Sequence, residues 1–437
     1  MDLNLPRKIE ISALQVLVSG FGTLATIFVL SLSPLAFCGW ILLAPLDAHE
    51  AAAAGRCFCP LIALCGFLAA AIVYRAGFWN ASSSLGRRSR FVWIFVALLF
   101  AFVHRYRWDI RLAGVPRTDD LPINTKGYEI EKLPFQFHVS FAQGRTIYFA
   151  DAGGDVFRAE DSNPVGTLRR IGRSGLAPRS LVVSSKGSIF VSGDHQPMLR
   201  SSDGGHTWEK VLDFPVWRMA EDEVSGTLYA GNYSKGPGVH AVVVQSKDDG
   251  RTWRQVFADA QLDHVHTLRF DPSFRRIYIA TGDGPRRGQA YSDDAGSTWH
   301  WILRGRKQGY TDVAISRSLT LWGSDDRLGR IVCGTRNAPL SGETVLWSKG
   351  QQVWFVTAQD AQVFVGTFVE DTWNRHPVYL LASRDEGRSW QKLLEYGASQ
   401  PGPKGYVTDS RQLSVGGWLY FTDGNGQGYR VRRSPSH

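Results

Sequence analysis

The sequence predicts an all-β propeller of seven four-stranded blades, with six blades as the alternative, preceded by an α-helical transmembrane region of about three helices. Three observations lead to this fold class: long apolar segments near the N-terminus, a motif that recurs about every 45 residues, and short aliphatic-aromatic stretches between its copies. A period in this range is typical of propellers and solenoids. The chain has 437 residues, which is enough for more than one domain.

Apolar sequence dominates residues 1–113, which we predict to be the transmembrane region. The expected helices cover about residues 11–45, 57–75 and 90–108. A bilayer core ~30 Å thick needs about 20 apolar residues per helix, so the first two segments are long enough. The third is short, and Tyr106 and Trp108 extend it as interfacial aromatic residues. This is more apolar sequence than a cleavable signal peptide contains.

Lys and Arg residues in the short loops indicate the orientation, because such residues are retained on the cytoplasmic side. They precede the first segment and flank the loop between the second and third segments at Arg7, Lys8, Arg75, Arg87, Arg88 and Arg90. We therefore expect a multi-pass protein of the cytoplasmic (inner) membrane with a cytoplasmic N-terminus and a periplasmic or extracellular propeller. If the third segment does not span, the propeller is cytoplasmic instead.

Charge and cysteine content narrow the class of protein. The net charge is +9, but the chain has no Lys/Arg run of the length of a basic arm, so we expect no nucleic-acid partner. Cys333 is the only cysteine after residue 113, which excludes an internal disulfide there. Cys57 and Cys59 have no His partners at metal-ligand spacing. We expect no metal and no cofactor.

A motif of the form S-x-D-x-G-x-[ST]-W occurs four times. Its copies are Ser201–Trp208, Ser246–Trp253, Ser292–Trp299 and Ser383–Trp390. They start 45, 46 and 91 residues apart, and 91 is about two periods, so a degenerate copy is expected near residue 338. Each copy belongs to one repeating structural unit.

Each unit contains four short strands, of which the second is the clearest. Examples are "TIYFAD", "SIFVSG", "TLYAGN", "RIYIATG", "QVFVGT" and "WLYFTD", and "SLTLWGSDDRLGRIVCGT" supplies a degenerate seventh unit. The last unit lacks an outer strand, and we expect Tyr128–Leu133 ("YEIEKL") to complete it, because closure removes an exposed sheet edge. The propeller is thus predicted to cover residues 128–437, after a linker at 114–127.

Every residue type in the motif has a role in folding. Asp in a tight turn accepts hydrogen bonds from backbone N–H groups, Gly permits a positive φ, and Trp packs between sheets. The residues that we assign to this structural role are Asp203, Trp208, Asp248, Trp253, Asp294, Trp299, Asp385 and Trp390.

The four copies resemble the Asp-box, or BNR, repeat of sialidase-like propellers, and the resemblance covers roughly residues 128–433. Similar repeats occur in bacterial sialidases, xyloglucanase-type glycosidases, sortilin-type receptors and the photosystem II assembly propeller. The resemblance implies the fold and leaves the function open, because one fold carries many functions. The N-terminal region resembles none of these families.

We assign no catalytic residue. The resemblance implies an F/Y-R-I-P segment if the chain is a sialidase, and the nearest stretch, "APRSL" at 177–181, keeps only Arg179. Other glycosidases need two carboxylates about 5–9.5 Å apart. The carboxylates that could lie near one face are Asp283, Asp312, Glu370 and Asp371, and nothing in the sequence pairs them.

Three long loops follow the second strand of their units, at 231–240, 281–289 and 366–377. We expect them to share the face opposite the motif turns, and exposed aromatic residues beside Arg suit recognition of a protein or a sugar. The candidate binding residues are Arg179, Arg218, Tyr233, Lys235, His240, Arg286, Arg287, Trp373, Arg375 and His376. His264 and His266 fall on one face of a strand, which is typical of a packed or channel-lining pair.

Two functions remain open. The first is a membrane-anchored, non-enzymatic recognition or scaffold protein, whose partners would be the lipid bilayer and either an envelope protein or an extracellular polysaccharide. The alternative is a membrane-tethered glycoside hydrolase, sialidase-like or xyloglucanase-like, that acts on extracellular glycans. A recognition protein needs an exposed aromatic or basic patch, whereas the hydrolase needs a carboxylate pair.

Overall fold

The computed structural model describes residues 109, 112–236, 238–283, 286–305, 309–326, 328–339, 343–369, 376–397, 408–409, 413–423 and 425–435. The three expected membrane helices lie outside these residues. Within the part of the chain that is described, no helix has the length and apolar character needed to cross a bilayer.

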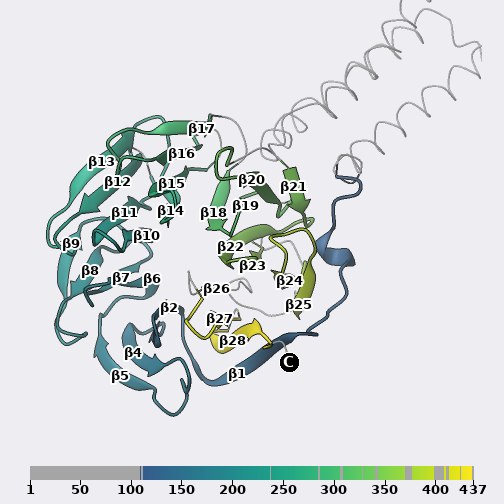
Figure 1. Ribbon diagram of the computed structural model, residues 1–437. Helices are drawn as coiled ribbons and strands as arrows, with labels where there is room; N and C mark the ends of the chain where they lie inside the picture. The colour runs from purple at the N-terminus through teal and green to yellow at the C-terminus, as the bar shows by residue number, and fades with distance from the viewer. Residues whose placement is uncertain are drawn as a thin grey trace, which may run out of the picture. The chain divides into compact units, whose positions relative to one another are not determined.

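The described residues from Val115 onward form seven four-stranded antiparallel sheets arranged in a ring (Figure 1). Blade 1 consists of β2 (Val139–Gln143), β3 (Thr146–Ala150), β4 (Asp155–Glu160) and β5 (Arg169–Arg173). Blade 2 consists of β6 (Pro178–Val183), β7 (Ile189–Gly193), β8 (Met198–Ser201) and β9 (Glu209–Leu212). Blade 3 consists of β10 (Val216–Asp222), β11 (Thr227–Asn232), β12 (Ala241–Ser246) and β13 (Arg254–Asp259).

The next three blades repeat this order. Blade 4 consists of β14 (Val265–Asp271), β15 (Arg276–Thr281), β16 (Gly288–Ser292) and β17 (His300–Arg304). Blade 5 consists of β18 (Tyr310–Ile315), β19 (Leu319–Ser324), β20 (Ile331–Thr335) and β21 (Glu343–Leu346). Blade 6 consists of β22 (Gln352–Gln359), β23 (Gln362–Phe368), β24 (Val378–Ser383) and β25 (Gln391–Tyr396). In Figure 1 the first strand of each blade lies nearest the centre of the ring.

Blade 7 combines strands from opposite ends of the described propeller. It contains β26 (Thr408–Asp409), β27 (Leu419–Thr422), β28 (Gln427–Arg433) and, as its outer strand, β1 (Tyr128–Gln136). β1 pairs antiparallel with β28, with Ile130 opposite Val431. The predicted seven blades and the predicted closure by the stretch at 128–133 are therefore confirmed, and the six-bladed alternative is wrong.

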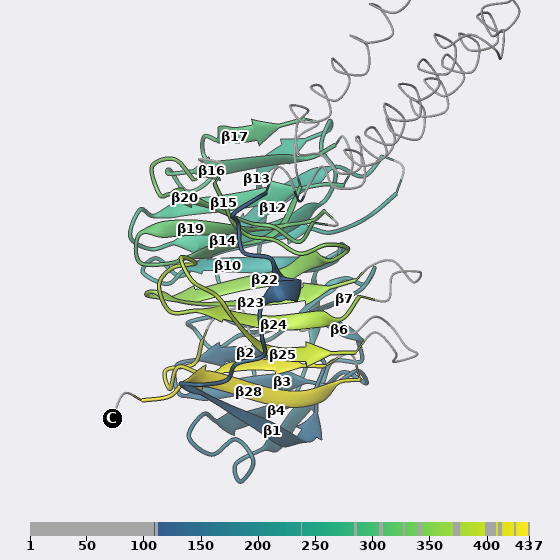
Figure 2. The same cartoon turned by 90° about the vertical axis from the view of Figure 1, so that its right-hand side faces the viewer.

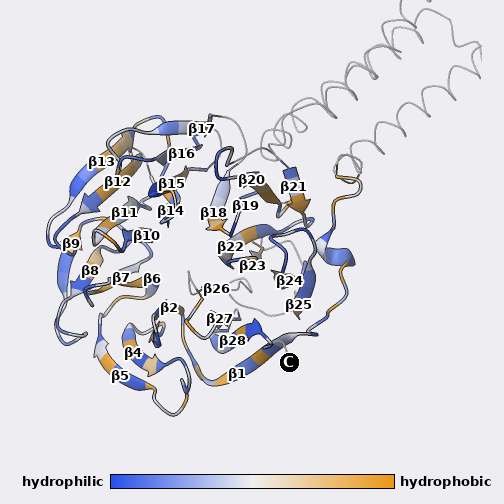
Figure 3. Ribbon diagram, viewed as in Figure 1, coloured by the Kyte–Doolittle hydropathy of each residue, from blue (hydrophilic) through white to orange (hydrophobic). Residues whose placement is uncertain are grey.

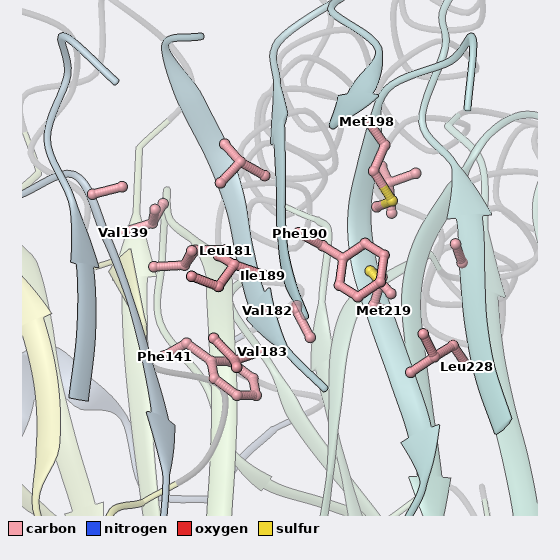
Figure 4. Close-up of a cluster of buried hydrophobic side chains, with 14 of the residues drawn as sticks. Val139, Phe141, Leu181, Val182, Val183, Ile189, Phe190, Met198, Met219 and Leu228 are labelled. Carbon is pink, nitrogen blue, oxygen red and sulfur yellow. The ribbon is translucent and has the colours of Figure 1, made fainter. Parts of the chain in front are cut away.

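Apolar residues fill the space between neighbouring blades. One cluster runs across blades 1 to 3 and includes Phe141, Leu181, Phe190 and Met219, which Figure 4 shows between the sheets. The second strands are buried almost throughout, because each is covered on both faces by adjacent blades. The outer strands β9 and β13 instead carry hydrophilic residues (Figure 3). Figure 2 shows the stacked blades from the side.

The four motif copies form the turns between the third and fourth strands of blades 2, 3, 4 and 6. In the first copy, the Asp203 carboxylate accepts hydrogen bonds from Thr207 N (3.0 Å), Thr207 Oγ1 (2.6 Å) and Ser201 Oγ (2.8 Å). The same three bonds recur at the other motif aspartates, Asp248, Asp294 and Asp385. The motif residues thus make the contacts that a turn-forming role requires.

Backbone conformation explains the invariant glycine position and its neighbour. The two residues after each motif aspartate both have positive φ, for example 61° at Asp249 and 81° at Gly250. Glycine adopts this region without steric cost. In the first three copies the tryptophan that ends the motif also closes the turn, as where Trp208 Nε1 donates to Gly205 O at 3.0 Å. In the fourth copy, Trp390 Nε1 has no hydrogen-bond partner among the described residues.

Two blades have altered turns at this place. In blade 5 the turn between β20 and β21 falls where the degenerate copy is expected, near residue 338. In blade 1, residues 161–168 form the turn, a copy that we did not recognise in the sequence. There Asn163 replaces the aspartate, and its backbone carbonyl oxygen accepts a hydrogen bond from Thr167 Oγ1 at 2.6 Å.

Residues that we expected in the linker run along two outer strands. Thr118 N donates to Trp347 O and Asn124 N donates to Lys392 O, both at 2.8 Å, and a short 3₁₀ helix, η1 (Thr118–Asp120), lies between them. Tyr379 Oη donates to Asp119 Oδ1 at 2.8 Å. This segment is therefore attached to blades 5 and 6. The domain boundaries themselves stay a prediction.

Ring closure predicts that β1 is essential for stability. Leu133 is 1% exposed and packs in a cluster that joins blades 7 and 1. Leu133→Ala is expected to lower the free energy of unfolding by about 2–5 kcal/mol, the usual cost of such a cavity. Chemical denaturation measures this loss. The exposed neighbour Lys132 is the control, and a similar loss for Lys132→Ala would contradict the assignment.

The turn contacts predict that Asp203→Ala lowers the melting temperature, because four hydrogen bonds to one carboxylate are lost. The Thr207 hydroxyl and the other donors hold the pKa of Asp203 well below its usual range. Its contribution is therefore present at neutral pH and is lost as the pH falls through the lowered pKa. Melting curves of Asp203→Ala and of Ser202→Ala, in the same turn, provide the comparison. Equal melting temperatures would contradict the turn-forming role.

Candidate functional site

A β-bulge interrupts the innermost strand of five blades at the same position. The pairing register shifts near the first residues of β6, β10, β14, β18 and β22. The residues at these bulges are Arg179, Trp217, Arg218, His266, Thr311 and Trp354. A bulge leaves a residue outside the ladder and re-aims its side chain. The bulges lie where the first strands begin, whereas the motif turns lie where the third strands end, so the two are at opposite faces of the ring. We call the face that carries the bulges the mouth.

Aromatic rings gather at the mouth. Trp217 stacks on Tyr233, which follows β11, with ring centroids 3.8 Å apart and an interplanar angle of 14°. Trp354 meets Trp217 edge to face at 5.0 Å. The Arg179 guanidinium lies 5.9 Å from the Trp354 ring centroid and pairs with Asp194 at 2.8 Å. Trp217 and Tyr233 are buried, whereas Trp354 and Arg179 are partly exposed.

A histidine-carboxylate cluster lies against these rings. His264 and His266, from the start of β14, have their Nε2 atoms 2.7 Å apart. Asp283, from the loop after β15, places its Oδ1 3.3 Å from His266 Nε2 and its Oδ2 3.7 Å from His264 Nε2. Lys235 Nζ lies 3.3 Å from Asp283 Oδ2, and Asp325 Oδ2 lies 3.6 Å from His266 Nδ1. Tyr233 contacts His264 edge to face at 4.6 Å.

The pKa values of the two histidines are shifted in opposite directions. Burial and the charge of His266 lower the pKa of His264 to about 3. Burial alone would also lower the pKa of His266, but its hydrogen bond to Asp283 and the charge of Asp325 outweigh burial and raise that pKa. The pKa of Asp283 is held well below its usual range, since the His266 contacts and Lys235 outweigh burial. His266 therefore keeps a proton to higher pH than an ordinary histidine.

A buried ion network lies next to the mouth and joins inner strands of four blades. Asp312, on β18, is fully buried, and its Oδ2 lies 3.1 Å from Arg269 Nη2 and 3.8 Å from Arg218 Nη2. Thr267 Oγ1 donates to Asp312 Oδ1 at 2.9 Å, and Val356 N donates to Oδ2 at 3.2 Å. Burial would raise the pKa of Asp312, but the two arginines hold it below its usual value.

The structure brings four of the predicted binding residues into this region: Arg179, Arg218, Tyr233 and Lys235. Others take different roles on the same loops. Arg286 Nη2 donates to three backbone carbonyls, the shortest at 3.1 Å to Val239 O, and Arg287 is buried. His240 and the exposed His376 are described, whereas Trp373 and Arg375 lie outside the described residues.

Trp217 and Trp354 are mouth residues that we did not identify from the sequence, which predicts His264 and His266 only as a packed or channel-lining pair. A signal was present, because the first strands align without gaps as "PRSLVV", "VWRMAE", "VHTLRF", "YTDVAI" and "VWFVTA". Their second letters are the bulge residues Arg179, Trp217, His266, Thr311 and Trp354. Asp283 and Asp325 come from loops, which do not align between units in the way that the first strands do.

A separate cavity of about 940 Å³ lies on the motif-turn side, among the turns that follow the first strands of blades 1 to 4. Its lining includes Gln143, Lys186, Glu221 and Arg275. Burial raises the pKa of Glu221, although Ser185 hydrogen-bonds its carboxylate. We did not predict this cavity.

Comparison with known proteins identifies the fold and gives no family. No protein-family model matches the chain, and no curated protein matches its sequence. The structure of YCF48 bound to D1 peptide matches with a TM-score of 0.50 at 13% identity, over 72% of this chain and 100% of that chain. A GH74 xyloglucanase from Xanthomonas campestris gives 0.49 at 17% identity, over 70% of this chain and 54% of that chain. The WD40 repeats of RRP9 give 0.48 at 13% identity, over 73% and 98%.

The match to the YCF48 structure supports a propeller fold and no closer relationship. The resemblance to the Asp-box family therefore stays a prediction, as do the candidate binding residues. This chain spans about half the length of the xyloglucanase, at 54% of it, so that enzyme's activity does not transfer.

The buried network predicts a large stability loss for Asp312→Asn. Removing one partner of a buried ion pair leaves uncompensated charge and typically costs about 3–5 kcal/mol. Because the pKa of Asp312 is lowered, its contribution is present at neutral pH and is lost as the pH falls through that pKa. Urea denaturation between pH 3 and 7 tests both statements. Asp213→Asn, in an exposed ion pair, is the control and is expected to cost at most about 1 kcal/mol.

Proposed function

We propose that this chain is a membrane-anchored, extracytoplasmic recognition or scaffold protein that binds a partner protein at the mouth and performs no catalysis. The observation that carries the proposal is the partly exposed ring of Trp354 at the mouth, with the guanidinium of Arg179 beside it and the exposed Lys235 nearby. The buried stack of Trp217 and Tyr233 supports the Trp354 ring. Trp, Tyr and Arg are the residues that most often dominate binding energy in protein interfaces.

The charges at the mouth suit a polar rim around an aromatic centre. Lys235 and Asp283 are each about half exposed, with side-chain exposures of 44% and 45%. Arg179 and Asp194 form a second ion pair there, with exposures of 24% and 45%. A partner can replace one member of such a partly solvated pair, because exposed ion pairs contribute only about 0–1 kcal/mol. Peptide-like partners with both charge and aromatic surface fit this arrangement.

The same geometry weighs against the glycoside hydrolase. Asp283 and Asp325 approach opposite nitrogens of the His266 ring, so an imidazole occupies the space between these carboxylates. Asp312 is held by two arginines that lower its pKa, whereas a general acid needs a raised pKa. Neither arrangement is a pair of carboxylates that face each other across an open space, and Glu370 and Asp371 lie outside the described residues.

Membrane anchoring is part of the proposal and is supported by the sequence of residues 1–113. The apolar segments there have the length of membrane helices, and the loop charges favour a propeller outside the cytoplasm. Three such helices exceed what an anchor needs. Their Gly/Ala/Ser-rich stretches at 19–33 and 51–72 would suit packing within a membrane complex.

Co-purification of the tagged full-length chain in mild detergent, followed by affinity measurement with the identified protein, tests this function. Trp354→Ala is expected to weaken binding about 30-fold, as truncation of a central aromatic residue does. Lys235→Glu is expected to weaken it about tenfold through charge reversal at the rim. Lys247→Glu reverses a charge on the motif turn of the same blade and should bind like the unchanged chain.

Three results would contradict the proposal. The first is retention of full affinity by both mouth variants, and the second is equal loss in Lys247→Glu. The third is recovery of the chain alone together with hydrolysis of a glycan, which would favour the hydrolase. Binding of an isolated polysaccharide with the same variant pattern would keep the mouth as the site but replace the protein partner.

A further inference from the structure

We propose that His264, His266 and Asp283 bind one divalent transition-metal ion, of which zinc fits best. One donor atom from each of these residues lies within 4.8 Å of the other two. The separations are 2.7 Å between the two Nε2 atoms, 3.3 Å from His266 Nε2 to Asp283 Oδ1 and 3.7 Å from His264 Nε2 to Asp283 Oδ2. This site goes beyond the proposed recognition function: it shares Asp283 with the rim of the mouth, but it needs no partner protein to bind the ion.

The spacing of the donors matches ligands of one ion. Zinc binds imidazole nitrogen and carboxylate oxygen at about 2.0–2.2 Å, so tetrahedral ligands stand roughly 3.3 Å apart. The 3.3 Å separation between His266 Nε2 and Asp283 Oδ1 matches this value, and the 2.7 Å between the two Nε2 atoms is somewhat shorter. Two imidazole nitrogens that face each other at 2.7 Å need a proton or a cation between them, because their lone pairs otherwise repel. A metal ion satisfies both nitrogens and the carboxylate together.

The outer nitrogens of both rings support the assignment. His264 Nδ1 and His266 Nδ1 are buried and have no hydrogen-bond partner among the described residues. Each faces a carboxylate, Asp263 Oδ1 at 3.5 Å and Asp325 Oδ2 at 3.6 Å. Metal-bound histidines usually present the Nδ1 proton to a carboxylate, which fixes the ring and the tautomer. A metal on Nε2 would place both Nδ1 protons toward these two carboxylates.

The local charge also favours a dication. Oxygens of Asp283, Asp325 and Asp263 lie 3.3, 3.6 and 3.5 Å from nitrogens of the imidazole pair, and Lys235 pairs with Asp283 through Oδ2. Carboxylate oxygens this close to the imidazoles attract a divalent cation. Lys235 contacts Oδ2 at 3.3 Å, which leaves Oδ1, the oxygen nearer His266, as the metal ligand.

The two histidines of the site are buried, whereas the carboxylate of Asp283 is accessible to solvent. His264 and His266 are 1% and 3% exposed, and both come from the bulged start of β14. Asp283 has a side-chain exposure of 45%, so an ion can approach from solvent. Two histidines with one carboxylate select zinc or a similar ion over magnesium and calcium, which prefer oxygen ligands. Three protein ligands leave a fourth position for water or a partner side chain.

Metal titration of the full-length, chelator-treated chain tests the site. Zinc is added in competition with a chromophoric chelator, and cobalt(II) is added separately for its visible absorption, which reports four-coordinate ligation. We expect one zinc per chain and a cobalt band that zinc abolishes. His266→Ala and Asp283→Asn should each lower zinc affinity at least 100-fold, and Asp325→Asn, which acts through His266, should lower it about 10- to 100-fold.

His240→Ala is the matched control, since His240 lies on the mouth side in the loop after β11 and makes no described contact with the cluster. It should bind zinc like the unchanged chain. Asp283→Asn is the decisive variant if His266→Ala fails to fold, because Asp283 is half exposed and lies in a loop. Absence of zinc binding by the unchanged chain, or unchanged affinity in Asp283→Asn, would overturn the proposal.

Discussion

The ring depends on one contact that recurs between blades, in which the turn after the third strand binds the preceding blade. In blade 3, Asp249 accepts hydrogen bonds from Ser184 Oγ at 2.6 Å and Ser188 Oγ at 2.5 Å, both in blade 2. In blade 6, Glu386 accepts bonds from Ser316 Oγ and Ser318 Oγ in blade 5, at 2.7 and 2.6 Å. Because Asp249 and Glu386 directly follow motif aspartates, folding of the motif turn also positions the link to the neighbouring blade.

The same contact closes the ring. In blade 1, Asp161 begins the corresponding turn and accepts hydrogen bonds from Tyr420 Oη at 2.8 Å and Gly416 N at 2.9 Å, both near β27 of blade 7. Arg430, on β28, donates to Asp161 O at 2.9 Å and pairs with Glu131 of β1 at 2.6 Å. The turn of blade 1 is therefore linked through Arg430 to β1, the strand that completes blade 7. Sheet pairing and turn-to-blade contacts close the ring at the same place.

The blades were predictable because a repeat reports the period of a fold directly. The outer strand supplied by Tyr128–Leu133 was predictable for a related reason, since the last unit lacked one strand. The site was less predictable, because its chemistry depends on loops. Alternation puts His264 and His266 on one face, but only the folded loops bring Asp283 and Asp325 to opposite nitrogens of the His266 ring. Asp161 was overlooked because its turn keeps neither the serine nor the tryptophan of the motif.

The bulges bring residues that face the mouth next to residues that hold the ring together, and two bulge residues, Arg218 and Thr311, belong to the second group. A residue at a bulge lies outside the ladder, so strand pairing does not constrain its side chain, and Trp217 and His266 can differ between blades. Residues one position further along the strands, Thr267 and Asp312, instead bond one inner strand to another. The residues that stabilise the ring and those that we propose for recognition thus occupy adjacent positions on the same strands. If the mouth is the binding site, a change at Trp354 alters binding while the network around Asp312 continues to hold the inner strands together.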